Sequence, residues 1–480
     1  MSSIRRAILL LLFTMPGLAA QSPAEARALE LTNILRLGRR DSLEAFIRRS
    51  FAPAFLNMAP MEQHIGFYEG FFDRAQGAER IGTRNVTPYA ATAYWYSPLL
   101  EDWYGVRLSV DSAAPHGILG PPPPMVTGAR PPEAAPPVVR AASDNAAWKS
   151  LDAWVQRLAG ADRFSGVVLV ARGNQVIGAN GHGDAAKEFG IRNTTNTKMI
   201  LGSVPKMFTA VSILQLVEEG KLSLDDPLAK FLPGVIPPPG DTAIRLKHLL
   251  THTSGLGDFL FTPEMMARNR AQYRTVASYL PLLKNSKPSF TPGSAWSYSN
   301  AGFLLLGAVL EKVEGVPYDT VIARRVFARA GMAETRNLDL DLVPKGTAFT
   351  YEREFTPAGP RWRSTRYDQP VHGTPAGGGH STAADMARFV DALRTHKLLS
   401  PAMTARMLTP KPELSSPNYG FGAQIFDAAA NLVGHTGGGP GTAAFVQFDK
   451  TTGLTAIVIS NNAGPSDVVA RRIFATFPIG

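Results

Sequence analysis

The chain has 480 residues, 45% of them hydrophobic, and a formal net charge of +10, which is typical of a globular protein of two or three domains and excludes a disordered chain. The absence of cysteine excludes disulfides, a thiol nucleophile and thiolate metal ligands. The basic residues are scattered, so we expect a solvated basic surface and no nucleic-acid site.

The first twenty residues have the pattern of a secretory signal peptide. Arg5 and Arg6 precede an apolar run over residues 7–13, and small residues close the segment at Ala19 and Ala20. The apolar run is too short for a convincing membrane span, and an uncleaved N-terminal anchor is the alternative. We predict a signal peptide over 1–20, export to the periplasm or the medium, and no stable membrane span after its removal.

A small unit follows over about residues 24–120. Its first part has apolar residues at helical spacing, and Asp41 with Glu44 forms a capping-box pattern that predicts the start of a second helix. Residues 103–110 alternate between apolar and other residues, as a half-buried strand does, and residues 89–96 offer a partner strand. The unit is therefore predicted to be a small α+β domain of unknown role.

Residues 121–146 are predicted to link this domain to the next. The stretch 120–137 is so rich in proline that we expect an extended, semi-rigid spacer without helix or sheet ladders. This composition marks a domain boundary.

The larger domain is predicted over 147–480. Two hairpin patterns bracket it, one turning at Gly173–Asn174 and the other at Lys450–Gly453, with mainly helical patterns between them. If the two hairpins pair, the chain closes one antiparallel sheet from both of its ends. We therefore predict an α/β fold, with helices around this sheet and a helical insertion.

Ser203 and Lys206 stand three residues apart in the tetrapeptide SVPK. An apolar stripe at helical spacing follows them and ends near Gly220. Residues three apart share a helix face, and a desolvated lysine at a helix N-terminus is neutral enough to accept a serine proton. The alternative is a capping serine followed by a surface lysine, because about one such spacing is expected by chance.

A second segment, Tyr298-Ser299-Asn300, follows a Pro–Gly turn and leads directly into an apolar helix. A tyrosine relays protons, or acts as a base when a neighbouring cation lowers its pKa, and an asparagine can hold a substrate carbonyl. Taken alone, this is a turn with ordinary polar residues.

A third segment, His435-Thr436-Gly437-Gly438, stands just before the closing hairpin as a glycine-rich turn. Glycines let a substrate approach the backbone closely and leave amide donors free, as an oxyanion hole requires. A phosphate loop is disfavoured, because the lysine and the Ser/Thr of that motif are missing.

In this order the three segments resemble the serine β-lactamase and penicillin-binding-protein superfamily, which carries a Ser-x-x-Lys signature. The phrases LKHLLTHTSGL (246–256), AGM (330–332) and PAGGGHSTAADMARF (375–389) look like its class C-related branch, with esterases and D-amino-acid peptidases. The resemblance extends from about Trp148 to Phe474. It implies a β-lactamase/transpeptidase-like antiparallel sheet, flanked by helices with a helical subdomain.

The resemblance also implies roles for the first two segments. Ser203 looks like the acylated nucleophile, and Lys206 looks like its activating base. Tyr298 matches the tyrosine that transfers protons, including during activation of the deacylating water. Asn300 would contact the substrate.

In the third segment the resemblance implies substrate contacts by His435, Thr436 and Gly437, and an oxyanion hole formed by the amides of the nucleophile and of Gly438. The β-lactamases and transpeptidases of the family carry a lysine where this chain has His435. A histidine near its ordinary pKa is mostly neutral at pH 7 and offers no fixed charge to a substrate carboxylate. This difference favours an ester or a modified peptide over a β-lactam as the substrate.

The remaining histidines suggest no second site. His248 and His252 are four apart, like zinc ligands on a helix, but the glutamate of His-Glu-x-x-His is absent. His380 either lines the cleft or caps the helix after it. The Gly-x-Ser-x-Gly elbow of α/β-hydrolases is absent from the chain. We expect no metal and no cofactor.

We predict a serine hydrolase that acts through an acyl-enzyme on a small ester, amide or D-amino-acid peptide. One alternative is a β-lactamase or D-Ala-D-Ala carboxypeptidase, and another is a non-catalytic ligand-binding or sensor protein of the same fold. A third is a peptidoglycan-binding adaptor whose biology resides in the N-terminal domain. The sequence leaves the oligomeric state open.

Overall fold

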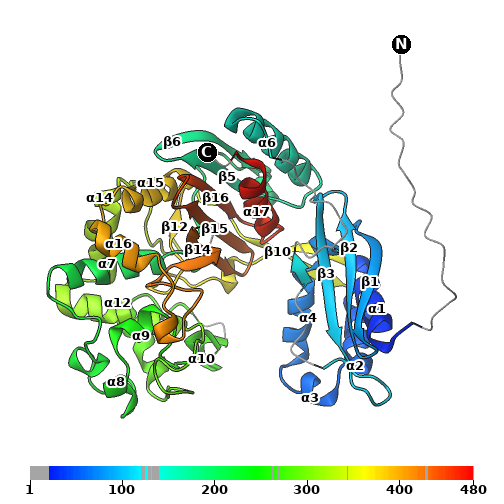
Figure 1. Ribbon diagram of the computed structural model, residues 1–480, viewed down its shortest axis with the longest axis horizontal. Coiled ribbons are helices and arrows are strands. Elements are labelled where there is room, and N and C mark those ends of the chain that lie inside the picture. Colours follow the sequence, from blue (N-terminus) through cyan, green and yellow to red (C-terminus); the bar gives the residue numbers. More distant parts are fainter. Residues whose placement is uncertain are drawn as a thin grey trace.

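The structure is a computed structural model that describes residues 21–119, 125–127, 131, 140–261, 263–266, 270–342, 344–427 and 431–478. The predicted signal peptide and most of the predicted linker lie outside the described residues. Figure 1 shows two units side by side, a smaller one drawn in blue and a larger one drawn from green to red.

The smaller unit is a four-stranded sheet, in the order β1-β2-β3-β4, with helices packed against it (Figure 1). In β3 the apolar residues Tyr104, Val106 and Leu108 are buried, and β3 pairs antiparallel with its predicted partner β2, so both strand predictions are confirmed. The elements are α1 (Pro23–Leu37), α2 (Arg40–Ser50), α3 (Pro53–Leu56), α4 (Met61–Glu69), α5 (Phe72–Ala75), β1 (Glu79–Thr87), β2 (Ala90–Ser97), β3 (Asp102–Ser109) and β4 (Met125–Thr127).

Two local predictions are wrong. Helix α2 starts at Arg40, so Asp41 lies in its first turn, where its carboxylate accepts a hydrogen bond from the amide of Ser42 and no capping box forms. Strand β4 lies inside the proline-rich stretch and pairs antiparallel with β3. Met125–Thr127 contains no proline and keeps the amide groups that a sheet ladder needs.

The larger unit contains a six-stranded antiparallel sheet in the order β13-β14-β15-β16-β5-β6. Both predicted hairpins form, and β16 pairs with β5 along its whole length, so the sheet does close from the two ends of the domain. The strands are β5 (Gly166–Arg172), β6 (Gln175–His182), β13 (Gln424–Asp427), β14 (Leu432–Gly439), β15 (Thr442–Asp449) and β16 (Leu454–Ser460).

Helices cover both faces of this sheet, because successive residues of its central strands point to opposite sides and both sides are apolar. In β5, Val168 packs in a core with α6 (Asp144–Gly160) and α17 (Ser466–Thr476), whereas Val167 and Leu169 join the core of the helical part. The helical part comprises α7 (Lys206–Glu218), α8 (Gly240–Ala243), α9 (Leu246–Leu250), α10 (Pro263–Met266), α11 (Val276–Tyr279), α12 (Asn300–Glu314), α13 (Tyr318–Ile322), α14 (Ala328–Ala330), α15 (Ala383–Arg394) and α16 (Pro401–Met407).

Three short strand pairs complete the larger unit, and one of them joins the two units. Phe355 of β10 is buried in the core of the smaller unit, where its ring lies 5.4 Å from that of Phe72. The pairs are β7 (Asp184–Ala186) with β8 (Ile191–Arg192), β9 (Met199–Ile200) with β12 (His380–Ser381), and β10 (Tyr351–Thr356) with β11 (Gly359–Ser364).

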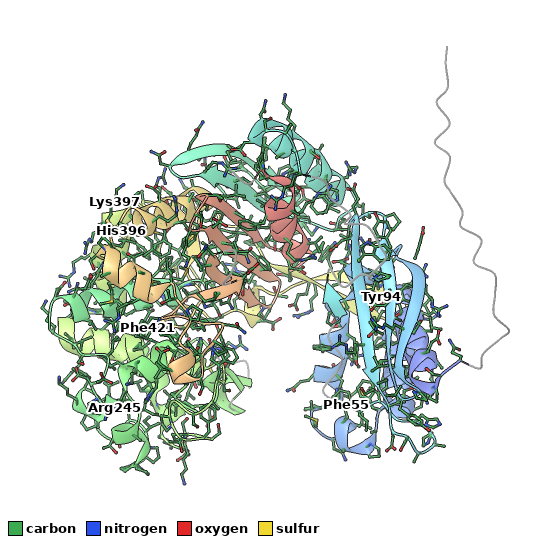
Figure 2. All side chains as sticks on the ribbon, in the orientation of Figure 1. Phe55, Tyr94, Arg245, His396, Lys397 and Phe421 are labelled. Atoms are coloured by element: carbon green, nitrogen blue, oxygen red, sulfur yellow. The ribbon has the colours of Figure 1, made fainter. Side chains whose placement is uncertain are left out.

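Figure 2 draws the side chains of both units as sticks and labels Phe55 in the smaller unit and Phe421 in the larger one, both of which are buried. Within the described parts of the chain, no helix combines the length and the apolar character needed to cross a bilayer.

Candidate active site

Ser203 lies in the turn between β9 and α7 and is partly exposed. Helix α7 starts at Lys206, and every residue from Lys206 to Leu216 is buried. A helix that is apolar around its whole circumference is accommodated only inside the core. Lys206, the first residue of this helix, therefore lies in the protein interior next to Ser203.

The amine of Lys206 is fully buried and has three oxygen neighbours. Its Nζ lies 3.1 Å from Ser203 Oγ and 2.6 Å from Asn300 Oδ1, and it also donates to the carbonyl oxygen of Ala376. Burial lowers the pKa of Lys206 to about 7, against a small opposing effect of the Asp258 charge.

A neutral amine fits this set of neighbours. Its two N–H groups can donate to the carbonyl oxygens of Asn300 and Ala376, which leaves the lone pair facing the Ser203 hydroxyl. In that state the Ser203 hydroxyl donates the hydrogen bond and Lys206 Nζ accepts it. The geometry is that of a serine with a base in hydrogen-bond contact.

Asn300 is held in one orientation by both of its amide atoms. It is the first residue of α12, whose N-cap Ser299 accepts a hydrogen bond from the amide of Gly302. Its Nδ2 donates to the carboxylate of Asp258, so its Oδ1 faces Lys206. Asp258 thus orients Asn300 from outside the three motifs.

Tyr298 completes the group around the serine. The Ser203 side chain is close enough to lower the pKa of the Tyr298 hydroxyl slightly, and the Lys206 amine lies 4.8 Å from the centre of the tyrosine ring. Burial raises the pKa of Tyr298 above its ordinary value, so the phenol stays protonated. Of the two roles considered for this tyrosine, a proton relay fits a phenol whose pKa is raised by burial, whereas a base would need a lowered pKa.

The predicted glycine-rich turn is instead the strand β14, which lies against the turn of Ser203. A β-carbon at Gly437 would stand 1.9 Å from the Leu201 carbonyl oxygen and 2.8 Å from the Ser203 amide nitrogen. A β-carbon at Gly202, whose φ is 55°, would stand 2.5 Å from the amide nitrogen of Gly438. The amides of Ser203 and Gly438, which we expect to form an oxyanion hole, therefore lie in two segments that can touch only because Gly202 and Gly437 have no side chain.

Two neighbours in β14 differ in exposure. Thr436 is half-buried, and both its amide and its hydroxyl donate to Gln424 Oε1, at 2.8 and 3.0 Å. Gly438 is exposed at the mouth of the site, where no atom lies within 4 Å of the position that a β-carbon would take. A substrate therefore has room to approach the backbone at this end of β14.

His435 is fully buried and turned away from this opening. Its Nε2 lies 2.8 Å from the hydroxyl of Tyr419, and its Nδ1 lies 2.6 Å from the carbonyl oxygen of Thr436. A carbonyl oxygen only accepts, so Nδ1 carries the proton and Nε2 accepts from the tyrosine. Burial, assisted by the charge of Lys206, lowers the pKa of His435 to about 3, so the ring is neutral at physiological pH.

A series of tilted and edge-on ring contacts connects His435 to Tyr298. The ring of His252 lies 4.2 Å from that of Tyr298 and 4.6 Å from that of Tyr419, which in turn lies 5.7 Å from His435. His252 is therefore part of the site as a packing residue. Its Nδ1 accepts a hydrogen bond from the amide of Ser299, and burial lowers its pKa well below the ordinary value.

The other singled-out histidines have local roles. His248 Nδ1 accepts a hydrogen bond from the amide of Arg245 at the start of α9. His380 is buried in β12, and Thr382 provides the cap of the following helix, so the capping alternative for His380 is wrong. Sequence reasoning missed Asp258, Tyr419 and the Ala376 carbonyl, for which the motifs contain no signal.

Comparison with known proteins agrees with this geometry. The family model described as Beta-lactamase matches residues 151–477. Penicillin-binding protein 4* of Bacillus subtilis (strain 168) is 30% identical over 327 residues, which are 65% of this chain and 71% of that protein. Esterase EstB of Burkholderia gladioli is 28% identical over 364 residues, which are 66% of this chain and 90% of the esterase.

A solved structure shows the same fold. The D-stereospecific amidohydrolase from Streptomyces sp. superposes with a TM-score of 0.58 at 27% identity, covering 68% of this chain and 98% of the amidohydrolase. The expected β-lactamase/transpeptidase-like sheet with flanking helices is thereby confirmed. The chain belongs to the Beta-lactamase family and is a serine hydrolase that works through an acyl-enzyme.

Proposed function

We propose that Ser203 is the nucleophile of this hydrolase and that Lys206 is its general base. The observation that carries the proposal is the buried amine of Lys206, with two carbonyl acceptors for its N–H groups and its remaining side toward Ser203 Oγ. A pKa near 7 keeps a large fraction of this amine unprotonated at neutral pH.

In acylation the Ser203 oxygen attacks the substrate carbonyl carbon, and the hydroxyl proton passes to Lys206 Nζ. The negative charge that develops on the carbonyl oxygen is stabilised by the amides of Ser203 and Gly438. When the tetrahedral intermediate collapses, the bond to the leaving group breaks. The leaving group takes up a proton from Lys206, and the acyl group stays on Ser203.

Deacylation repeats these steps with water as the nucleophile. Burial raises the pKa of Tyr298, so the phenol near Ser203 acts as a relay that gives one proton and receives another, without becoming a stable phenolate. The ester bond to Ser203 breaks, the acid product leaves, and the proton returns to the serine oxygen. Asn300 holds Lys206 through its Oδ1 and, at the floor of the site, contacts the bound acyl group.

The substrate is proposed to be a small carboxylic ester or the amide or peptide of a D-amino acid. The relatives support this range, because one is named an esterase and another a D-stereospecific amidohydrolase. At the position of His435 the site presents a neutral, fully buried ring, so it has no fixed positive charge there for the carboxylate of a β-lactam. β-Lactamase or carboxypeptidase activity is the second candidate.

Labelling with a fluorophosphonate tests the nucleophile, and a substrate panel tests the class. Wild-type protein should be labelled stoichiometrically, whereas Ser203→Ala should take no label, with Ser297→Ala as a control on an exposed serine of the same domain. A panel of short-chain esters, D-amino-acid amides and β-lactams should give the highest kcat/KM for the first or second class. Equal labelling of Ser203→Ala would show that Ser203 is not the nucleophile. A kcat/KM highest for β-lactams would contradict the proposed substrate class.

We also propose that the protein is exported, on the pattern of its first twenty residues. Expression of the full chain with N-terminal sequencing of the mature product tests this. Cleavage near Ala20 is expected, and an intact Met1 on protein that remains in the cytoplasm would contradict export.

A further inference from the structure

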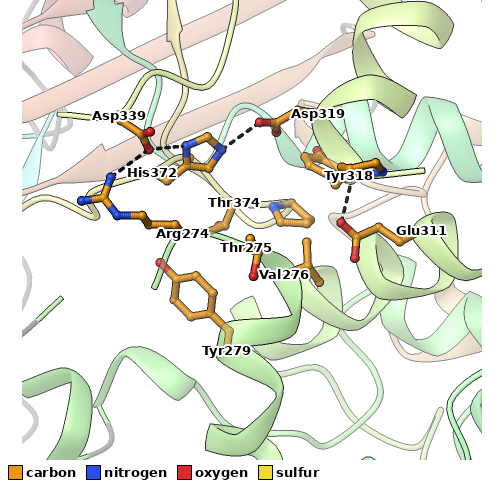
Figure 3. A pocket seen from close by; sticks show the side chains of 13 residues that line it. Arg274, Thr275, Val276, Tyr279, Glu311, Tyr318, Asp319, Asp339, His372 and Thr374 are labelled. Carbon is orange, nitrogen blue, oxygen red and sulfur yellow. Dashed lines mark hydrogen bonds and ion pairs between the residues drawn. The ribbon is translucent and has the colours of Figure 1, made fainter. Parts of the chain in front are cut away.

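Thr374 and Pro375, which directly precede Ala376 in the chain, line a cavity of about 150 Å³. Figure 3 shows His372 in its wall, with Asp319 and Asp339 on either side of the ring. Nε2 of His372 lies 2.8 Å from Asp319 Oδ2, and Nδ1 lies 2.8 Å from Asp339 Oδ1. The reaction described above uses none of these three residues.

The geometry specifies the protonation state of His372. Carboxylate oxygens only accept hydrogen bonds, and a neutral imidazole has only one N–H to donate. Two contacts of 2.8 Å to two carboxylates are both favourable only when the ring carries two protons. The hydrogen bond and charge of Asp319, with those of Asp339 in addition, raise the pKa of His372 above its ordinary value.

The groups around His372 come from several elements. Asp319 lies in the first turn of α13 and also accepts a hydrogen bond from Asn337. Asp339 also faces Arg274 at 3.5 Å, and Arg274 in turn pairs with Asp341. The other titratable groups that line the cavity are Tyr279 of α11, Glu311 of α12 and Tyr318 of α13.

His372 begins a short loop, residues 372–378, that supports the candidate active site. The Pro375 carbonyl accepts a 2.7 Å hydrogen bond from Thr209 of α7, and the Ala376 carbonyl accepts from Lys206. The amide of Gly378 donates to the Gly202 carbonyl, next to the nucleophile, at 2.8 Å. The loop thus contacts both the lysine and the serine turn, while its first residue is fixed by the two carboxylates.

We propose that His372 is a positioning residue for Lys206, because its doubly protonated ring ties Asp319 to Asp339 and so fixes the loop that supplies the Ala376 carbonyl to the lysine. This inference rests on the proposed role of Lys206 as the base. A group whose pKa is raised by folding stabilises its surroundings below the unfolded pKa, and that contribution is lost as pH rises through the folded pKa. The loop therefore loosens on the alkaline side of the optimum.

The expected pH profile has two limbs of different origin. Activity rises with pH through about 7 as Lys206 loses its proton. It falls again at higher pH as His372 loses its second proton and one of its nitrogens faces a carboxylate without a hydrogen between them. The acid limb reports the titration of Lys206, and the alkaline limb reports the titration of His372.

The test is the pH dependence of kcat in variants of the full chain. His372→Gln should lower kcat about 10- to 100-fold with little change in KM, because the base is displaced while the substrate contacts remain. His372→Arg should restore most of this loss and remove the alkaline limb, because a guanidinium keeps its charge and the cavity gives it room. The matched control is His182→Gln, which removes another buried histidine with a carboxylate partner, Asp152 at 3.2 Å, on β6.

A second variant tests the inference if His372→Gln fails to fold. Asp339→Asn at the half-buried partner should move the alkaline limb to lower pH, because the imidazolium loses one of its two carboxylates. An unchanged limb in Asp339→Asn, or a wild-type kcat and profile in His372→Gln, would overturn the positioning role. If Ser203→Ala retains activity, the proposed function itself fails. Loss of activity in Ser203→Ala together with a wild-type profile in the His372 variants would overturn this inference alone.

Discussion

Helix α7 and strand β14, on two sides of the candidate site, each contain a buried basic side chain, Lys206 and His435. Burial has opposite consequences for the two side chains. At the start of α7, Lys206 is withdrawn from water but stays 3.1 Å from the oxygen of Ser203, so a pKa lowered to about 7 suits it to the base role proposed for it. In β14, His435 is withdrawn as completely, yet its ring is hydrogen-bonded to Tyr419, and a pKa lowered to about 3 makes it an uncharged part of the core.

Desolvation alone therefore does not create a catalytic group. It removes the charge from both side chains, and the direction of the remaining lone pair decides which of them can act. For Lys206 the carbonyl oxygens of Asn300 and Ala376 use up the N–H groups and leave the lone pair toward Ser203. For His435 the lone pair is already occupied by a tyrosine hydroxyl.

Replacing the lysine has the largest expected effect. Lys206→Gln should lower the acylation rate by about 10²- to 10⁴-fold, because the amide has no basic nitrogen for the serine proton. The measurement is stopped-flow acylation with an activated ester.

Lys411→Gln is the matched control, because Lys411 is also buried and donates to carbonyl oxygens, but of Thr409 and Pro410. A Lys206→Gln enzyme within tenfold of wild type would show that another group takes the proton.

Removing the charge of Asp258 should have an intermediate effect. This charge raises the pKa of Lys206, so in Asp258→Asn the acid limb of the pH–rate profile should move to lower pH. The maximal rate should fall about tenfold, because an amide oxygen accepts the hydrogen bond of Asn300 less strongly than a carboxylate and orients its side chain less firmly. Profiles of kcat against pH for both proteins measure the two effects. A limb displaced to higher pH would contradict the assignment of that limb to Lys206.

Substitution of His435 should have the smallest effect on the chemistry and a clear effect on stability. His435→Leu leaves the buried Tyr419 hydroxyl without its acceptor, which should cost about 1–3 kcal/mol in the free energy of unfolding. The acylation rate by a small ester should stay within about threefold of wild type, since the ring does not contact the nucleophile. Urea unfolding and ester kinetics on one preparation check both statements. An ester rate reduced a hundredfold would place His435 in the chemistry.

The sequence predicts the contact of Ser203 with Lys206 at the start of α7 better than the contacts of His435 in β14, for physical reasons. Ser203 and Lys206 lie within one turn of chain, so local helical geometry brings them together. The acceptor of His435 comes from Tyr419, sixteen residues away across a strand pair, and neither residue shows from its own surroundings that the other will be its partner. The carbonyl of Ala376 is a backbone group, which no residue type reveals.

The fold shows the same division. The two hairpins follow from a period of two and from turn residues, and they form as predicted. Their pairing through β16 and β5 is only a condition at the level of sequence, because periodicity does not specify long-range partners. The strand β4 inside a proline-rich stretch, and the insertion of Phe355 into the core of the smaller unit, depend on long-range packing. Local patterns predict neither of them.

The pH dependence of Ser203 acylation tests the central claim most directly. The rate of labelling by a fluorophosphonate, measured in single turnover from pH 5 to 10, isolates the state of the base from deacylation and product release. With Lys206 as a buried neutral amine, the rate should rise with a midpoint near pH 7. A midpoint near pH 10, the value of a solvated lysine, or a rate independent of pH would contradict the claim.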